Sequence, residues 1–368
     1  MNAKGSIIII ALSLTIVLTM LSLLTWAYLG SCDWIGRLNF EAPPVVSYPF
    51  ILPKPKNNES FVPFAIVGDT QRTSFWECAI GREVNDDATS NIVTSIVTSK
   101  AQFLVHLGDM VFDGGNKRHW QFFDRTVLPW RETKLPILPV LGNHEYWGNK
   151  ARARKYVEER FPEIRINTWY SKQNGNLGMI FLNSNHFEMS NDMWEAQTTW
   201  FKALLETWSL KDDIKGVMLF AHHPPYTNSV VVSSDLKIRS DIVKFFCKTK
   251  KAMVMVTGHA HGYERFENIG TSLSCSNRTH FKSSNRSETL GNNFKQSVQF
   301  VVSGGGGGPR PNRLKNVYND AFAGHAPRPF NYLLVSPSNN GVQILTYGLQ
   351  KGQKETYVID KMTLEFPN

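Results

Sequence analysis

Five short polar clusters along the chain carry side chains that can bind metal ions. Together they offer carboxylate, amide and imidazole donors and no thiolate. This mixture suits Mn, Fe, Zn or Co better than Ca or Mg, and the lack of thiolates argues against a structural zinc site. In chain order the clusters are Gly68-Asp69-Thr70-Gln71, Gly108-Asp109, Gly142-Asn143-His144-Glu145, His222-His223-Pro224 and Gly258-His259-Ala260-His261.

A metal that binds close to the backbone needs space where the chain leaves a strand. Glycine directly precedes Asp69, Asp109, Asn143 and His259, and it allows a sharp turn with no side chain in the way. If the chain bends between His259 and His261, the two imidazoles can reach different metals. The same question of geometry arises for Asp69 and Gln71, which are also two residues apart.

Each cluster follows a short apolar run, and such runs predict buried strands. The runs are Phe64–Val67, Phe103–Leu107, Ile137–Leu141, Val217–Phe220 and Met253–Thr257. Helices are predicted at Asp86–Lys100, Arg118–Trp130, Lys150–Arg160, Asp192–Trp208 and Leu236–Lys248. Strands that alternate with helices favour an α/β layered domain, in which ligands gather at the carboxyl ends of the strands. The clusters lie at such ends.

The order of the five clusters resembles that of the calcineurin-like metallophosphoesterase superfamily. The stretch Gly258–Arg265 is most similar to the purple-acid-phosphatase branch, and the glycine run that ends at Pro309 resembles a segment of secreted members. The resemblance implies an α/β (α+β layered) fold with a central β-sandwich flanked by helices. It also implies a dinuclear site at the carboxyl ends of the strands, filled by two divalent or trivalent ions (Mn, Fe, Zn or Co).

The implied reaction is hydrolysis of a small phosphoester by a bridging hydroxide on the two-metal site. Two metals can generate hydroxide at neutral pH and hold the phosphoryl oxygens, which otherwise repel it. A phosphomonoester is the favoured substrate. The alternative in this class is a phosphodiesterase or pyrophosphatase that acts on nucleotides or lipid head groups. These reactions share one site and differ in the loops around it.

The resemblance implies a role for each candidate residue. His144 would be the catalytic residue beside the scissile ester, without metal contact, and could protonate the leaving oxygen. Glu145 would orient a neighbouring group, as carboxylates around metal sites commonly do. His223 would support or pack against its neighbour. The metal ligands would be Asp69 and His261 for the first ion, Asn143, His222 and His259 for the second, and Asp109 for both.

Two positions depart from the family pattern. Gln71 stands where many members have His, and a neutral amide is a weaker ligand or none, so the first metal is expected to bind loosely. Phe112 stands where the purple branch has a metal-binding Tyr, and a phenyl ring cannot coordinate. The alternative of another class is a membrane-tethered binding protein with a decayed metal site, which Gln71 favours. A third hypothesis is an envelope or adhesion protein that uses its basic surface.

The composition is that of a folded chain with a large core. It has 368 residues, of which 42% are hydrophobic. The net charge of +9 favours anionic partners such as phosphate esters. The basic residues are dispersed, and the densest cluster, at 150–155, is expected to be a solvated helix face. No specific nucleic-acid site is recognised, and the oligomeric state stays open.

The N-terminus predicts export. Residues 7–29 form an uncharged stretch, long enough to span a membrane or to act in a signal peptide. Residues 29–32 resemble a lipoprotein processing site, so residues 1–32 are predicted to be a signal peptide or membrane anchor, or a lipoprotein signal acylated at Cys32. If Cys32 is acylated, the three remaining cysteines allow one intrachain disulfide at most.

The rest of the chain divides into a spacer and a domain. The proline-rich residues 33–60 are predicted to be an extended spacer, and residues 61–368 the metallophosphoesterase catalytic domain. The domain would then lie outside the cytoplasm, either membrane-anchored or secreted. Residues 267–297 are either a variable surface insertion or a loop over the site.

Three further features have structural interpretations. His106 is predicted to be a core histidine with satisfied ring nitrogens. Arg72, next to Gln71, is expected at the surface rather than on a phosphate. The run Ser303–Pro309 lacks the Lys-Ser/Thr of a phosphate-binding loop and predicts a tight passage of the backbone.

Phe112 gives a spectroscopic prediction. Without a tyrosinate ligand, the pure protein should show no tyrosinate-to-iron absorption, because that band needs a phenolate on the metal. An absorption spectrum in the visible range measures this directly. A band of that type would contradict the interpretation of position 112.

Overall fold

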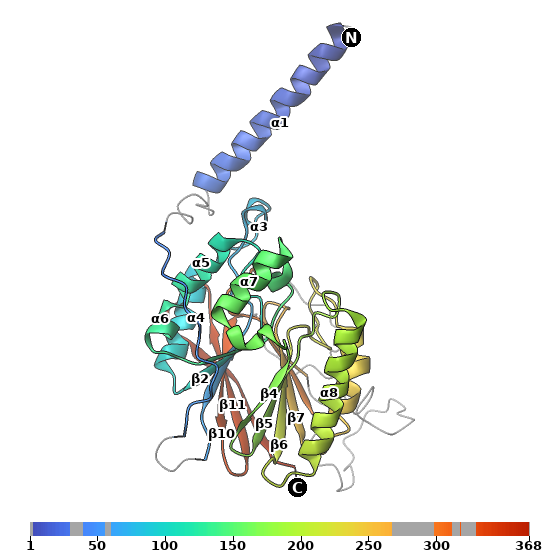
Figure 1. The fold of residues 1–368 in the computed structure, drawn as a ribbon. Coiled ribbons are helices and arrows are strands. Elements are labelled where there is room, and N and C mark those ends of the chain that lie inside the picture. The colour runs from blue at the N-terminus through green and yellow to red at the C-terminus, as the bar shows by residue number, and fades with distance from the viewer. Residues whose placement is uncertain are drawn as a thin grey trace, which may run out of the picture.

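Two six-stranded sheets form the centre of the molecule. The computed structural model describes residues 3–29, 40–55, 60–266, 298–310, 317 and 329–367. The sheets share one hydrophobic core, and helices cover their outer sides (Figure 1). The predicted β-sandwich flanked by helices is confirmed.

The first sheet joins a parallel half to an antiparallel half. Its order is β12-β11-β10-β1-β2-β3, in which β1, β2 and β3 are parallel and the other pairs are antiparallel. The strands are β1 (Phe64–Val67), β2 (Phe103–His106), β3 (Ile137–Pro139), β10 (Phe330–Pro337), β11 (Gly341–Leu349) and β12 (Tyr357–Glu365).

The second sheet has a parallel centre and antiparallel edges. Its order is β4-β5-β6-β7-β9-β8, and only the β4–β5 and β8–β9 pairs are antiparallel. The strands are β4 (Tyr170–Asn174), β5 (Leu177–Phe181), β6 (Gly216–Phe220), β7 (Ala252–Thr257), β8 (Tyr263–Phe266) and β9 (Gln299–Ser303).

Alternate residues of the second sheet enter two different layers of core, because successive side chains on a strand point to opposite faces. On β6, Met218 and Phe220 join the core between the sheets, whereas Val217 and Leu219 pack with helix α8 (Asn191–Ser209). Both faces of this sheet are therefore covered. A sheet fixed in this way holds the ends of its strands in place.

Most helices lie where the sequence predicts them. Helix α7 (Lys150–Arg160) has the predicted bounds, and α4 (Asp86–Thr98) begins at the predicted residue. The single helix predicted at Arg118–Trp130 is wrong, because Val127 ends one helix and caps the next, and Pro129 lies in the first turn of the second. These two helices are α5 (Lys117–Thr126) and α6 (Leu128–Glu132).

Shorter helical segments complete the layers. The predicted helix at Leu236–Lys248 is divided into a helical turn, a π-helical turn and a second helical turn. In chain order, the segments are α3 (Phe75–Ala79), η1 (His144–Tyr146), η2 (Pro162–Arg165), α9 (Leu236–Ile238), η3 (Arg239–Val243) and α10 (Lys244–Phe246). Figure 1 shows α3, α5 and α7 at one end of the sandwich and α8 along its side.

The N-terminal apolar stretch forms helix α1 (Ala3–Leu29). In the part of the chain that the structure describes, no helix is both long enough and apolar enough to cross a membrane. Cys32, the predicted acylation position, lies outside the described residues, as do residues 267–297 and all of 311–328 except 317.

Residues 40–55 have no regular secondary structure but pack along the domain. Tyr48 stacks on Phe161 with the ring centroids 5.4 Å apart, and Phe50 is also buried. The Tyr48 N–H donates to the Arg160 carbonyl at 2.8 Å, and Pro49 accepts from the Ile137 N–H at 2.9 Å. This part of the predicted spacer therefore adds side chains to the core.

Glu83 connects the chain after α3 to the end of the glycine run. Its carboxylate accepts from the Arg310 Nε atom at 2.8 Å, from Nη2 at 3.0 Å and from the Arg310 backbone N–H at 3.0 Å. Burial by itself raises the pKa of Glu83, but the hydrogen bonds and charge of Arg310 outweigh it and lower the pKa to about 2.

We expect Glu83→Gln to lower the melting temperature at neutral pH, because the amide cannot replace the charged acceptor. The pKa of Glu83 in the folded state lies below the ordinary value of 4.5, so its stabilisation is present above that pH and is lost as the pH falls toward 2. Thermal unfolding across this range should show the gap between wild type and variant closing. Glu132→Gln, at an exposed position, is the control. A gap that does not change with pH would count against this account.

Candidate metal centre

The predicted site residues come together at the carboxyl ends of five strands. Asp69 and Gln71 follow β1, Asp109 follows β2, and Asn143 and His144 follow the end of β3. His222 follows β6, and His259 and His261 follow β7. The two sheets each supply part of the set, so the site lies across the top of the sandwich.

One group of donor atoms surrounds His222. Its Nε2 atom lies 3.2 Å from Asn143 Oδ1, 3.1 Å from His259 Nδ1 and 3.2 Å from Asp109 Oδ2. Its Nδ1 atom lies 2.8 Å from the Leu107 carbonyl, which can only accept, so Nδ1 carries a proton. In the neutral ring the Nε2 lone pair then faces other acceptors, an arrangement that suits a cation.

A second group surrounds His261. Its Nδ1 atom lies 2.9 Å from the Pro309 carbonyl, which leaves Nε2 as the free donor atom of the neutral ring. Nε2 lies 3.5 Å from Asp69 Oδ1 and 2.9 Å from Gln71 Nε2. Asp69, Asp109 and His261 lie close enough together to hold one metal ion. Gln71 presents its amide nitrogen, so the amide must turn over before its oxygen can bind a metal.

Asp109 lies between the two groups. Its Oδ2 atom is 3.2 Å from His222 Nε2 and 3.5 Å from Gln71 Nε2. Its Oδ1 atom accepts the His144 backbone N–H at 3.0 Å. One carboxylate therefore faces both sets of donors, as a bridging ligand would.

The backbone at the strand ends is left-handed at four of the predicted ligands. The φ angles are 60° at Asp69, 54° at Asp109, 69° at His259 and 45° at His261. Non-glycine residues rarely adopt such angles, which cost on the order of 1 kcal/mol or more each. The bend predicted between His259 and His261 is present, and it lets the two rings reach different donor groups.

Glu145 fastens two of the strand ends together. Its Oε2 atom accepts the backbone N–H groups of Asp109 at 2.8 Å and Gly142 at 2.7 Å, and its Oε1 atom accepts that of Met110 at 2.7 Å. Gly142 has no room for a Cβ atom, because the Asp109 carboxylate occupies that space. Glu145 therefore orients its neighbours, in the way the sequence suggests.

Three buried carboxylates give the site an excess of negative charge. Burial raises the pKa of Asp69 well above its usual range, and burial together with Asp109 raises that of Glu145. Burial opposes ionisation of Asp109 too, but the imidazoles of His144 and His222 keep its pKa low. Burial lowers the pKa of His222, yet Asp109 beside it raises the net value to about 9. Cations in the two donor groups would neutralise this charge, so the residues fit a pair of metal ions.

His144 is held at the edge of the site by a hydrogen bond and by aromatic rings. Its Nδ1 atom lies 2.6 Å from the Phe112 carbonyl, and its Nε2 atom lies 3.7 Å from Asp109 Oδ2. Trp147 packs against the imidazole in a tilted arrangement with the ring centroids 3.7 Å apart, and the centroid of the Phe112 ring lies at 5.3 Å. Sequence reasoning missed Trp147, and its position three residues after His144 was the signal available.

The glycine run at 304–308 holds the backbone of the first donor group by hydrogen bonds. The N–H groups of Gly306 and Gly308 donate to the carbonyls of Gly68 and Asp69, at 2.9 and 2.8 Å. These N–H groups are therefore occupied, in agreement with the predicted backbone passage. The Pro309 carbonyl that holds His261 also accepts from Arg82 Nη2 at 2.6 Å.

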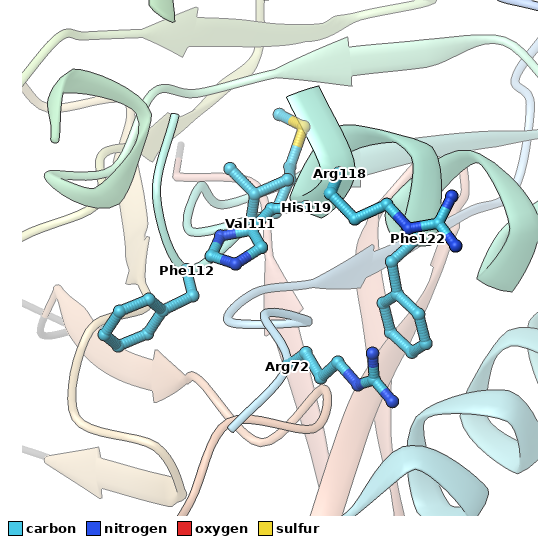
Figure 2. A pocket seen from close by; sticks show the side chains of 7 residues that line it. Arg72, Val111, Phe112, Arg118, His119 and Phe122 are labelled. Carbon is cyan, nitrogen blue, oxygen red and sulfur yellow. The ribbon is translucent and has the colours of Figure 1, made fainter. Parts of the chain in front are cut away.

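A small pocket adjoins the site beside Arg72 (Figure 2). Val111, Phe112 and His119 line one part of it, and Phe122 lies opposite. The surface position expected for Arg72 is wrong, since its side chain is only 9% exposed. The guanidinium pairs with Asp86 at 3.1 Å and lies over the Phe122 ring, with its central carbon 4.1 Å from the ring centroid.

His106 is a buried core histidine, as the sequence predicts. Its Nε2 atom is 3.0 Å from Thr70 Oγ1, and its Nδ1 atom accepts the Gly108 N–H at 3.2 Å. Burial lowers its pKa to about 3, so the ring is neutral. It supports the turn before Asp109 and takes no direct part in the donor groups.

Comparison with known families agrees with this arrangement. The family model for the calcineurin-like phosphoesterases matches residues 62–263, which is more than half of the chain. The chain therefore belongs to the calcineurin-like phosphoesterase family. This family is named for the hydrolysis of phosphoesters. Among curated proteins, no sequence matches the chain.

Solved structures share the fold at low sequence identity. A purple acid phosphatase, PPD1 from yellow lupin (Lupinus luteus) seeds, has a TM-score of 0.60 and 18% identity over 83% of this chain and 54% of its own. GAP50, the anchor in the inner membrane complex of Plasmodium, has a TM-score of 0.56 and 15% sequence identity, over 83% of this chain and 89% of its own. A dimetal phosphatase from Danio rerio has a TM-score of 0.54 and 14% sequence identity, over 83% of this chain and 99% of its own. This chain thus spans about half of the lupin protein, and these likenesses concern the fold alone.

The Glu145 interactions predict a large effect on stability. In Glu145→Gln one oxygen becomes an NH₂ group, which leaves a buried N–H without an acceptor and should cost about 1–3 kcal/mol of unfolding free energy. Denaturant unfolding measures this. Glu188→Gln, at a partly exposed ion pair with Lys150, is the matched control and should change little. An equal loss of unfolding free energy in the two variants would show that the Glu145 hydrogen bonds do not stabilise the fold more than the exposed ion pair does.

Proposed function

We propose that this protein hydrolyses phosphomonoesters at a dinuclear metal centre. In the proposed centre, Asp109 serves both ions, and His144 is the catalytic residue. The first ion would be held by Asp69, Gln71 and His261, and the second by Asn143, His222 and His259. The observation that carries the proposal is the position of Asp109 Oδ2, within 3.2 Å of His222 and 3.5 Å of Gln71.

The residues around the centre have separate tasks in this reaction. When bound, the metal pair supplies Lewis-acid activation of water and neutralises the charge of the phosphoryl group. Asp69 and Asp109 keep fixed orientations through backbone N–H groups of His259 and His144. Fixed ligands lower the reorganisation that the reaction would otherwise need.

His144 is suited to give a proton to the leaving oxygen. Its Nδ1 proton is directed at the Phe112 carbonyl, so the ring presents Nε2 to the site. Trp147 and Phe112 pack against the imidazole and limit its rotation. When the ring is an imidazolium, Nε2 carries the proton that can be given to the leaving oxygen. A general acid of this kind contributes roughly 10²–10⁴ in rate.

We further propose that the domain, placed at residues 61–368, acts outside the cytoplasm. Support comes from two cysteines, Cys78 and Cys247, because each of them takes part in a disulfide bond. Disulfides persist in oxidising compartments. Residues 1–32 would direct export. Residues 33–60 would connect the two parts, and the buried Tyr48 and Phe50 mean that a truncated form of the protein should retain residues 40–55.

Hydrolysis of p-nitrophenyl phosphate and bis-p-nitrophenyl phosphate by the full-length protein tests the proposal. With Mn, Zn, Co or Fe added, we expect turnover that prefers the monoester. Asp109→Asn should lose metal and turnover together. His144→Ala should keep its metal and lose roughly 10²–10⁴ in kcat. Asp212→Asn, an exposed position, is the matched control.

The other outcomes are equally informative. A preference for the diester would favour the phosphodiesterase alternative. Folded wild-type protein that turns over neither ester with any metal would favour a binding protein with a decayed site. Full activity of His144→Ala would remove His144 from the mechanism.

A further inference from the structure

His223 has one ring nitrogen whose protonation state is set by Ser184. The Ser184 Oγ atom accepts the backbone N–H groups of His222 at 3.1 Å and His223 at 2.9 Å, and it lies 2.9 Å from His223 Nδ1. A hydroxyl group has two lone pairs and one hydrogen. Both lone pairs are in use, so the hydrogen points at His223 Nδ1. The neutral ring must then carry its own proton on Nε2.

The ring lies beside the ligands proposed for the second metal. Its centroid is 5.0 Å from that of His222 and 4.6 Å from that of His259. One of its nitrogens is within 4.8 Å of donor atoms of both residues. Proximity alone would make His223 a third imidazole ligand. The hydrogen bonds argue against that, because Nδ1 is taken by Ser184 and Nε2 carries hydrogen.

The Nε2 atom has no hydrogen-bond partner within the described residues. The residue is partly exposed, and Nε2 is not among the fully buried atoms that lack a partner, so a ligand can reach the N–H group. A donor that is open in this way can bond to an acceptor on a ligand in place of water. A phosphoryl group at the metal centre has oxygens that can only accept, and it would be within reach of this edge of the centre.

His144 has the opposite arrangement. Its Nδ1 proton is directed at the Phe112 carbonyl, so Nε2 is the atom that gains or loses a proton. In His223 the atom facing the site is already a donor, and the other nitrogen is held by a hydroxyl. The two imidazoles are thus prepared for different tasks, proton transfer in one and hydrogen bonding in the other.

We propose that His223 binds substrate, with its Nε2–H group donating to a non-bridging phosphoryl oxygen, and that Ser184 is the positioning residue that fixes this tautomer. The proposal rests on the proposed phosphoesterase function and deepens it. His223 would hold the phosphoryl group from the side of the second metal, while His144 serves the leaving oxygen. The sequence alone does not indicate this role for His223.

The tautomer can be tested without metal or substrate. Nitrogen-15 NMR of the metal-free, full-length protein at neutral pH should show His223 protonated on Nε2 and bare on Nδ1. Ser184→Ala should weaken that preference, because Nδ1 loses its donor. A His223 ring protonated on Nδ1, or on both nitrogens, would overturn the proposal.

Binding of inorganic phosphate to the metal-loaded protein tests the contact itself. His223→Phe keeps a ring but has no donor, and we expect calorimetry to show phosphate affinity weakened by about 10- to 100-fold, since the lost hydrogen bond is to a charged group. KM for p-nitrophenyl phosphate should rise by a similar factor. His223→Gln, which keeps an N–H donor, should recover part of the loss and also covers the case in which His223→Phe does not fold.

Metal content measured in the same samples separates the competing outcomes. Unchanged metal with weaker phosphate binding supports the proposal. Loss of one metal in both variants would make His223 a ligand and overturn it. Wild-type phosphate binding in both variants would overturn it as well, while leaving the proposed function intact. A folded wild-type protein that neither binds phosphate nor turns over any ester would overturn the proposed function together with this inference.

Discussion

The burial of three carboxylates in one place is the constraint on which the rest of the site depends. Glu145 is satisfied within the protein, because three backbone N–H groups donate to it. Asp69 accepts the His259 N–H group with both oxygens at 2.9 Å. Asp109 has one oxygen that accepts from the backbone and another that faces imidazoles and an amide. Buried charge of this density needs cations or protons, and the imidazole nitrogens around it are arranged for cations.

The backbone pays for this arrangement with local strain. Four predicted ligands have positive φ angles between 45° and 69°, a conformation that costs on the order of 1 kcal/mol or more for each non-glycine residue. Strain persists only where the surroundings leave no alternative. Here the strands that precede these residues are buried on both faces, and hydrogen bonds from Glu145 and the glycine run hold the turns. The sandwich core therefore supplies the energy that keeps the donors converged.

The strands that precede polar clusters can be predicted from the sequence, because the apolar run indicates the strand and the polar cluster after it indicates where the strand ends. Phe64–Val67 was predicted with its observed bounds. The strands β10, β11 and β12 have no cluster after them, and their alternating polar residues, such as Thr346 in β11, hide the pattern among loops. The hydrogen bonds that decide chemistry were also out of reach. Ser184 follows an unpredicted strand, and no local pattern connects it to His223, which is 39 residues away.

The two donor groups differ in how completely they are prepared for a metal. Around His222, the Leu107 carbonyl fixes the tautomer, and the atoms that face inward from Asn143 and Asp109 are acceptors. Around His261 the tautomer is fixed in the same way by Pro309, but Gln71 turns a hydrogen-bond donor toward it. A cation that enters the first group must displace that hydrogen bond and turn the amide. One that enters the second group must displace the proton that Asp109 favours on His222, whose pKa is raised to about 9. The protein thus competes for both imidazoles, through the Gln71 amide at the first position and through a proton at the second.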